Sequence, residues 1–83
     1  MNKEEILLTL NDFTKSDYPL ISETAKTIQM GIDGGLSNSE LEELTKDLMK
    51  SMKIQEEVES IENKLIFEEA YEILKLIISS FKP

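Results

Sequence analysis

Carboxylates are the chemically capable side chains that this chain holds in quantity, with 17 Asp and Glu among 83 residues. Several Glu stand three positions apart, in the pattern E-x-x-E, which places both side chains on one face of a helix. Carboxylates gathered in this way suit a divalent cation such as Mg²⁺. The pairs are Glu40 and Glu43, Glu56 and Glu59, Glu59 and Glu62, and Glu69 and Glu72. In so acidic a chain this spacing also arises by chance, and we interpret these residues as a solvated surface.

The E-x-x-E spacing is similar to one motif of the MazG-like all-α nucleotide pyrophosphatases, which hold Mg²⁺ with E-x-x-E and E-x-x-D motifs on facing helices. The resemblance implies a helical, divalent-metal-dependent enzyme. This chain departs from the family because Asp47 is its last Asp, so that no E-x-x-D follows, and because it has no Arg to bind a triphosphate. It also has no His for the Glu-x-x-His motif of di-iron bundles. We keep this enzyme class as a remote alternative.

The segment around Asp33 resembles the latter half of an EF-hand calcium loop over about eight residues. In that pattern the fifth, sixth, ninth and twelfth positions would be Asp33, Gly34, Ser37 and Glu40. The first and third positions, which need oxygen ligands, would be Gln29 and Gly31. Ser37 and Glu40 also form the S-x-x-E capping box, and Leu36 and Leu41 have the spacing of a hydrophobic staple. We therefore predict a helix start at Ser37 and no calcium site.

The residue types that are missing exclude further chemistry. The chain has no Arg, His, Cys or Trp, which supply most proton shuttles, soft-metal ligands and phosphate clamps. No His stands ready to activate a Ser or Thr nucleophile. We predict no catalytic, cofactor-binding or metal-binding residues and no enzymatic activity. The net charge of −8 and the scattered nine lysines argue against direct binding of nucleic acid, which needs a basic stripe.

Gly and Pro divide the chain into helical segments, and no alternating pattern typical of a strand occurs. We predict a first helix from Asn2 or Lys3 to about Lys15, with Glu5 completing an N-cap pair. A second helix starts at a Ser16 or Asp17 cap with Pro19 in its first turn, and ends at Gly34 or Gly35. The third starts at Ser37, and we prefer a break between Lys50 and Ile54 over one continuous helix. The predicted apolar faces are Ile6, Leu7, Leu10 and Phe13 in the first helix, Leu41, Leu44, Leu48 and Met52 in the third, and Ile54, Val58, Ile61 and Leu65 after the break.

These features predict an all-α fold: a bundle of three to four helices with a long C-terminal helix, possibly dimeric, as one acidic domain over residues 1–83. A chain of this length buries only about 60% of the surface that it exposes when unfolded, so its stability margin is thin. No signal peptide is visible at the start. The apolar stretch from Ile73 to Phe81 is far shorter than the roughly 20 residues that span a bilayer. We expect a cytoplasmic protein without a membrane partner.

The C-terminal segment is apolar around much of its circumference, which is typical of a buried helix. Two arrangements fit: the segment is the central helix of a single chain, or it is an interface with a protein partner or a second copy. For the second arrangement the candidate partner-binding residues are Ile73, Leu74, Ile77, Ile78 and Phe81.

The function that these observations favour is a small non-enzymatic protein–protein interaction module, acting as adaptor, assembly factor or inhibitor. Its size and acidity also suggest a phage-encoded protein. An alternative is an antagonist that imitates nucleic acid and binds a basic partner protein. The acidic face for that role would consist of Glu56, Glu57, Glu59 and Glu62.

Overall fold

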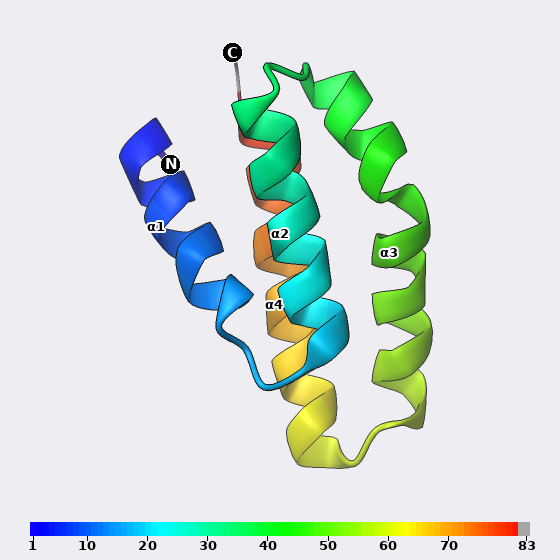
Figure 1. Cartoon of the computed structure of the whole chain (residues 1–83). Helices are drawn as coiled ribbons and strands as arrows, with labels where there is room; N and C mark the ends of the chain where they lie inside the picture. The colour runs from blue at the N-terminus through cyan, green and yellow to red at the C-terminus, as the bar shows by residue number, and fades with distance from the viewer. Residues whose placement is uncertain (82–83) are drawn as a thin grey trace.

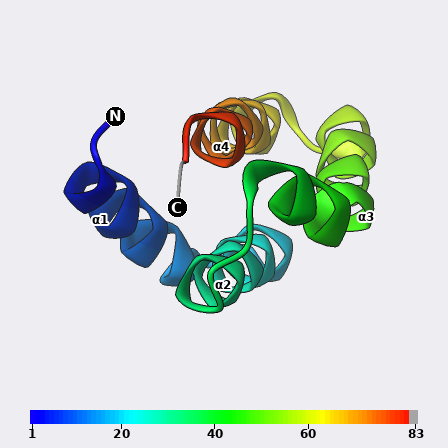
Figure 2. The same cartoon turned by 90° about the horizontal axis from the view of Figure 1, so that it is seen from above.

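The computed structural model of the chain describes residues 1–81 and shows four α-helices, with no strand in that range (Figure 1). The helices are α1, Lys3–Thr14; α2, Pro19–Asp33; α3, Asn38–Val58; and α4, Ile61–Ser80. Seen end-on, they follow one another around a shared interior in the order of the chain (Figure 2). α4 packs mainly against α3, and α2 packs against both α1 and α3. The predicted all-α bundle with a long C-terminal helix is confirmed.

The helices of this bundle lie side by side and determine the length of the molecule. The molecule extends 37 Å along its longest axis, and a 20-residue helix is about 30 Å long, so α3 and α4 run along most of it (Figure 1). No helix within residues 1–81 combines the length and the apolar character that crossing a membrane requires.

The starts of the first two helices agree only in part with those predicted from the sequence. α1 begins after Asn2, whose Oδ1 accepts a hydrogen bond from the Glu5 N–H at 2.8 Å, as predicted. Pro19 lies in the first turn of α2, also as predicted, but the N-cap is Tyr18 and neither Ser16 nor Asp17. The Ser16 hydroxyl oxygen instead accepts from the Tyr18 N–H at 3.1 Å. Ser16 therefore stabilises the turn that leads into α2.

The turn after α2 is a Schellman motif, which needs one residue in the left-handed region. That residue is Gly35, with φ of 77°. The Leu36 N–H donates to the Gly31 carbonyl and the Gly35 N–H to the Ile32 carbonyl, each at 3.0 Å. Two carbonyls at the end of α2 are thereby satisfied, and the chain is turned into α3.

The start of α3 is the predicted capping box. The Ser37 N–H donates to Glu40 Oε1 at 3.0 Å, and the Glu40 N–H donates to Ser37 Oγ at 3.3 Å. These two hydrogen bonds satisfy two backbone donors at the helix N-terminus. The Ser37 backbone and, to a smaller extent, its side chain hold the pKa of the Glu40 carboxyl below its ordinary value.

A close approach of α2 and α3 determines how α3 is rotated. Gly31 is buried on α2, and a Cβ at this position would lie 2.4 Å from Leu41 Cδ2 and 3.3 Å from Leu36 Cδ1. Only a residue without a side chain lets Leu41 pack so closely against α2. With Leu41 turned inward, helical periodicity also turns inward the residues that follow at steps of three or four, and the buried residues of α3 are Leu41, Thr45, Met49, Met52 and Glu56.

The predicted apolar face of α3 is therefore wrong in part. Leu44 is 49% exposed and Leu48 is half-buried, whereas Thr45 is fully covered. The Thr45 hydroxyl donates to the Leu41 carbonyl at 2.7 Å, so it can be buried without an unsatisfied donor. Glu56 is buried with a Lys53 ammonium 3.5 Å from its Oε2. A pattern of apolar residues does not reveal that these two polar side chains face the core.

The boundary between α3 and α4 also differs from the prediction. α3 continues through the residues 50–54 and ends at Val58, and the break lies at Glu59 and Ser60, both with extended backbone. Glu59 accepts hydrogen bonds from two side chains, Gln55 Nε2 on α3 and Asn63 Nδ2 on α4. Asn63 in turn accepts from the Tyr18 hydroxyl at 2.7 Å. This polar network links both helices at the turn to the start of α2.

The later break leaves the predicted stripe after Ile54 outside the core. Its members are exposed on the two helices that meet at the turn: Ile54, Val58, Ile61 and Leu65. The inward face of α4 starts at Phe67, which makes an edge-to-face contact with the Tyr18 ring at 5.3 Å between centroids. Farther along α4 the core residues are Ala70, Leu74, Ile77 and Ile78, followed by Phe81.

The assignment of α4 faces gives a matched pair of substitutions. Leu74→Ala removes a fully buried side chain and should lower the free energy of unfolding by about 2–5 kcal/mol. Leu76→Ala shortens a side chain that is 52% exposed and should change the free energy of unfolding by less than about 0.5 kcal/mol. Urea unfolding followed by circular dichroism measures both. If Leu74→Ala is unfolded from the outset, Ile77→Val provides a milder buried change, and equal effects at the two faces would contradict the structure.

The capping box predicts a dependence of stability on pH. Because the pKa of Glu40 is lowered by folding, its contribution is complete above its ordinary value of 4.5 and is lost as the pH falls through the lowered value. The Glu40→Gln variant lacks this titration. Its melting temperature should lie below that of the parent chain at pH 7, and the difference should shrink on acidification. A difference that is as large at pH 3 as at pH 7 would rule out this role of the carboxylate.

Candidate functional site

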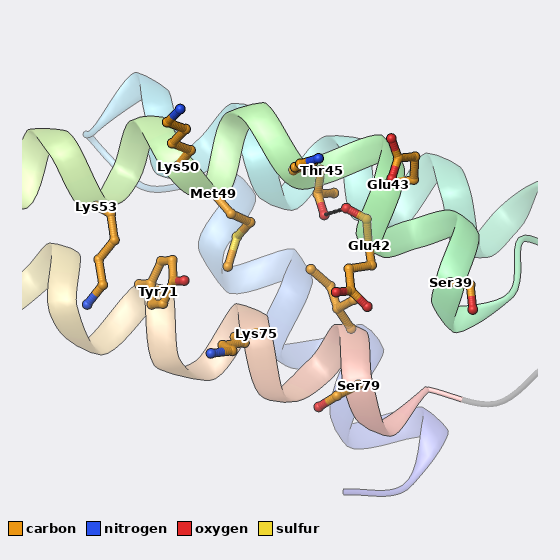
Figure 3. A pocket seen from close by; sticks show the side chains of 12 residues that line it. Ser39, Glu42, Glu43, Thr45, Met49, Lys50, Lys53, Tyr71, Lys75 and Ser79 are labelled. Carbon is orange, nitrogen blue, oxygen red and sulfur yellow. Dashed lines mark hydrogen bonds between the residues drawn. The ribbon is translucent and has the colours of Figure 1, made fainter.

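A groove of about 730 Å³ runs between the outer sides of α3 and α4 (Figure 3). The two helices are joined by the short turn at Glu59 and Ser60, so they run antiparallel and enclose the groove along their length. At the far end Asn38 Nδ2 donates to the Ser79 carbonyl at 2.9 Å, which ties the start of α3 to the end of α4. The groove is lined by Ser39, Glu42, Glu43, Thr45, Lys46, Met49, Lys50, Lys53, Tyr71, Lys75, Ile78 and Ser79.

Lysines dominate the charge of this lining. Lys46, Lys50 and Lys53 follow the helical spacing of four and three along α3, and Lys75 stands on α4. Four of the nine lysines thus line the groove, against only two of the 17 carboxylates. The groove is locally positive on a chain whose net charge is −8. We refer to the four lysines together with Tyr71 as the lysine groove.

Tyr71 is the point on which two of these lysines converge. The Lys53 ammonium lies 4.6 Å from the centroid of its ring and the Lys75 ammonium 5.9 Å from it, one from each helix (Figure 3). A cation near an aromatic face at an exposed site is attracted by about 0.5–1 kcal/mol. The ring is half-buried and packs against the core, which holds it in one position beside the two ammonium groups.

Only one lysine of the groove has a carboxylate partner within the described chain. Lys53 pairs with Glu56 at 3.5 Å. In residues 1–81 no carboxylate oxygen approaches within 4.0 Å of the ammonium groups of Lys46, Lys50 or Lys75. Lys50 is exposed, and its side chain points away from α4 (Figure 3). These three ammonium groups are hydrogen-bond donors and positive charges that an oxyanion can engage.

The groove has two chemically different ends. Lys53, Lys75 and Tyr71 lie toward one end, and Glu42, Glu43 and Ser39 lie toward the other (Figure 3). Between them the floor is formed by Met49 and Ile78, both buried. This arrangement combines an apolar floor with a charged rim, so it can bind an amphipathic segment and give it a direction.

The residues predicted to bind a partner lie mainly elsewhere. Leu74, Ile77, Ile78 and Phe81 are buried in the core, and Ile73 is half-buried against it. This is the internal-core arrangement, one of the two that the sequence left open. Ile78 alone among the five also lines the groove.

The residues predicted to form an acidic face are divided between two helices and their junction. Glu56 is buried beside Lys53, and Glu59 accepts hydrogen bonds from Gln55 and Asn63. Glu57 on α3 and Glu62 on α4 are the exposed members. Half of the set therefore has a contact within the fold. In residues 1–81 no group of three or more acidic side chains is placed so that it could hold a metal ion.

Sequence reasoning missed the lysine groove, because the lysines appear scattered when all nine are considered together. A usable signal was present: Lys46, Lys50 and Lys53 have the spacing of one helix face. The contribution of Lys75 and Tyr71 from another helix has no such local signal.

Comparison of the chain with family models, with curated proteins and with solved structures finds no match. The function is therefore inferred from the residues of this chain alone.

The contacts at Tyr71 make a prediction for NMR spectroscopy. Because the Lys53 and Lys75 side chains lie near the ring, their ε-methylene protons should resonate upfield of those of the exposed Lys26. The shift should be larger for Lys53, which is nearer, and should vanish in Tyr71→Leu, a substitution that keeps an apolar side chain against the core. Resonances of Lys53 and Lys75 that coincide with those of Lys26 in the parent chain would contradict this geometry.

Proposed function

We propose that the chain is a small non-enzymatic protein-interaction module, an adaptor, assembly factor or inhibitor, that receives a segment of a partner protein in the lysine groove. The observation that carries this proposal is the combination in one place of an apolar floor, an aromatic ring and cations that form no ion pair within residues 1–81, on an otherwise acidic surface. Grooves between helices that offer an apolar floor and a charged rim are a recurring way to bind amphipathic segments.

The dimensions of the groove support a segment of a few helical turns. From Ser39 to Lys53 the lining spans 15 residues of α3, whose 14 steps correspond to about 21 Å of helix axis. Met49 and Ile78 line the groove and are 9% and 6% exposed, so an occupant contacts the edges of these core side chains without unfolding the bundle. The bundle supplies a preformed surface, which lowers the entropic cost of binding.

Site-specific photocrosslinking tests this proposal. A photoreactive phenylalanine analogue replaces Glu43, which lines the groove, or Glu23, which is exposed on α2. Neither change removes a lysine. In an extract of cells that make the protein, the probe at position 43 should give a discrete product of higher mass that the probe at position 23 does not give.

The mass of the product identifies the kind of occupant. A product of twice the chain's 9.5 kDa would mean that a second copy occupies the groove. Equal products from both positions would mean nonspecific contact, and no product from position 43 would remove the groove as the interaction surface.

A further inference from the structure

We infer that the partner segment is an acidic amphipathic helix, whose carboxylates pair with Lys46, Lys50 and Lys75 across the groove. This inference rests on the proposed function and adds the chemistry of the partner. Its basis is the spacing of the lysines, the different charge of the two ends of the groove, and the finding that within residues 1–81 no carboxylate oxygen lies within 4.0 Å of three of the ammonium groups.

The spacing of the lysines matches that of a helix. Along α3 the step from Lys46 to Lys50 is about 6 Å and the step from Lys50 to Lys53 about 4.5 Å, from the rise of 1.5 Å per residue. A partner helix laid alongside α3 brings acidic residues at the same intervals of four and three to these heights. At the third height Lys53 is paired with Glu56, so the carboxylate there is placed near the Tyr71 ring to meet Lys75 of α4. Carboxylates with that spacing share one face of their own helix.

The groove also favours a helical occupant over an extended one. α3 and α4 use their backbone groups within their own helices, so the groove offers no strand edge to an incoming segment. An extended segment on the floor of Met49 and Ile78 would leave its N–H and C=O groups unpaired there. A helix satisfies these groups internally and presents only side chains to the groove.

The charges near Tyr71 favour carboxylates at one end of that helix. Lys53 and Lys75 approach the same ring from two helices, and their positive charges repel one another. Lys53 is paired with Glu56, so of the two ammonium groups at this ring that of Lys75 is the one without an ion pair in the described part of the chain. A carboxylate of the partner helix beside the Lys75 ammonium offsets this repulsion and accepts a charge-assisted hydrogen bond from it.

The opposite end of the groove limits how far the acidic stripe can extend. Glu42 and Glu43 would repel acidic residues there, so the partner helix must be neutral or basic at that end. The helix therefore has a defined direction in the groove. A nucleic acid carries negative charge along its whole length and would meet both Glu42 and Glu43, besides the −8 charge of the chain.

Three synthetic peptides test the inference. Each is a 14-residue helix, held helical by a hydrocarbon staple on its outer side, with Leu on the groove side and three variable positions spaced by four and three residues. The variable positions carry Glu, Gln or Lys, and the rest of each peptide is identical. Fluorescence anisotropy measures the dissociation constants at low and at moderate salt, and ¹⁵N-labelled chain reports the site through its amide shifts.

The Glu peptide should bind about tenfold more tightly than the Gln peptide, and the Lys peptide most weakly. Added salt should weaken binding of the Glu peptide and leave that of the Gln peptide nearly unchanged, because screening acts on the ion pairs. The perturbed amides should lie around Lys46, Lys50, Tyr71 and Lys75. In the triple variant Lys46→Gln, Lys50→Gln, Lys75→Gln, the advantage of Glu over Gln should disappear.

A matched triple variant controls for the change in net charge. Lys3→Gln, Lys15→Gln, Lys26→Gln removes the same three charges from exposed positions away from the groove and should keep the tenfold preference. A preference lost equally in both variants would show only a long-range effect of net charge and would overturn the inference. Circular dichroism confirms that both variants keep their helices.

The outcomes separate this inference from the proposed function. If the Glu and Gln peptides bind equally in the groove, the inference of an acidic partner helix is wrong. It is also wrong if a DNA duplex displaces the Glu peptide from the groove, as reported by the same amide shifts. If the photocrosslink from position 43 persists when the three groove lysines are neutralised, the groove still receives a partner, but not through these charges. If that crosslink never forms, the proposed function itself fails.

Discussion

The contact of Leu41 with Gly31 is the constraint on which the arrangement of α3 depends. The backbone of a helix does not determine the rotation of the helix about its own axis, which decides which side chains face the core. Gly31 leaves a gap on α2 that the Leu41 side chain approaches most closely, with Leu36 and Leu44 beside it. The Schellman turn and the capping box determine the path of the chain between Gly31 and Leu41. Once Leu41 is turned inward, Lys46, Lys50 and Lys53 lie on the outer flank of α3, beside α4.

The other end of the hairpin is held by polar contacts. Glu59 lies where the helix is interrupted and accepts hydrogen bonds from Gln55 before the turn and Asn63 after it. Through Asn63 the network reaches Tyr18 at the start of α2. The network and the Gly31 contact lie near opposite ends of α3, and together they hold the helix that bears three of the groove lysines in a fixed orientation relative to α4 (Figure 1).

Few of the positive charges of the chain form ion pairs within the fold, and this determines how the surface charge is distributed. In residues 1–81 the one ion pair joins Lys53 and Glu56, and it lies at the groove itself. The many carboxylates elsewhere repel acidic molecules, whereas the locally positive groove suits the short acidic segment that we propose as its occupant. Surface ion pairs contribute little to stability in water, so these lysines cost the fold little if they serve binding instead.

By itself the sequence determined the features that depend on neighbouring residues: the helical class, the N-caps at Asn2 and Ser37, the glycine turn at residues 34–35 and the position of Pro19. These features depend on backbone hydrogen bonds across three to six residues, which local residue types control. Tertiary structure alone decided which face of α3 is buried, because the packing of Leu41 against Gly31 of α2 turns Thr45 and Glu56 inward. The partners of these two polar side chains, the Leu41 carbonyl and Lys53, lie within α3 itself. Tertiary structure also connects the break at Glu59 to α2, through the hydrogen bond from Tyr18 to Asn63, and it forms the groove, where Tyr71 and Lys75 meet lysines 18 or more positions away.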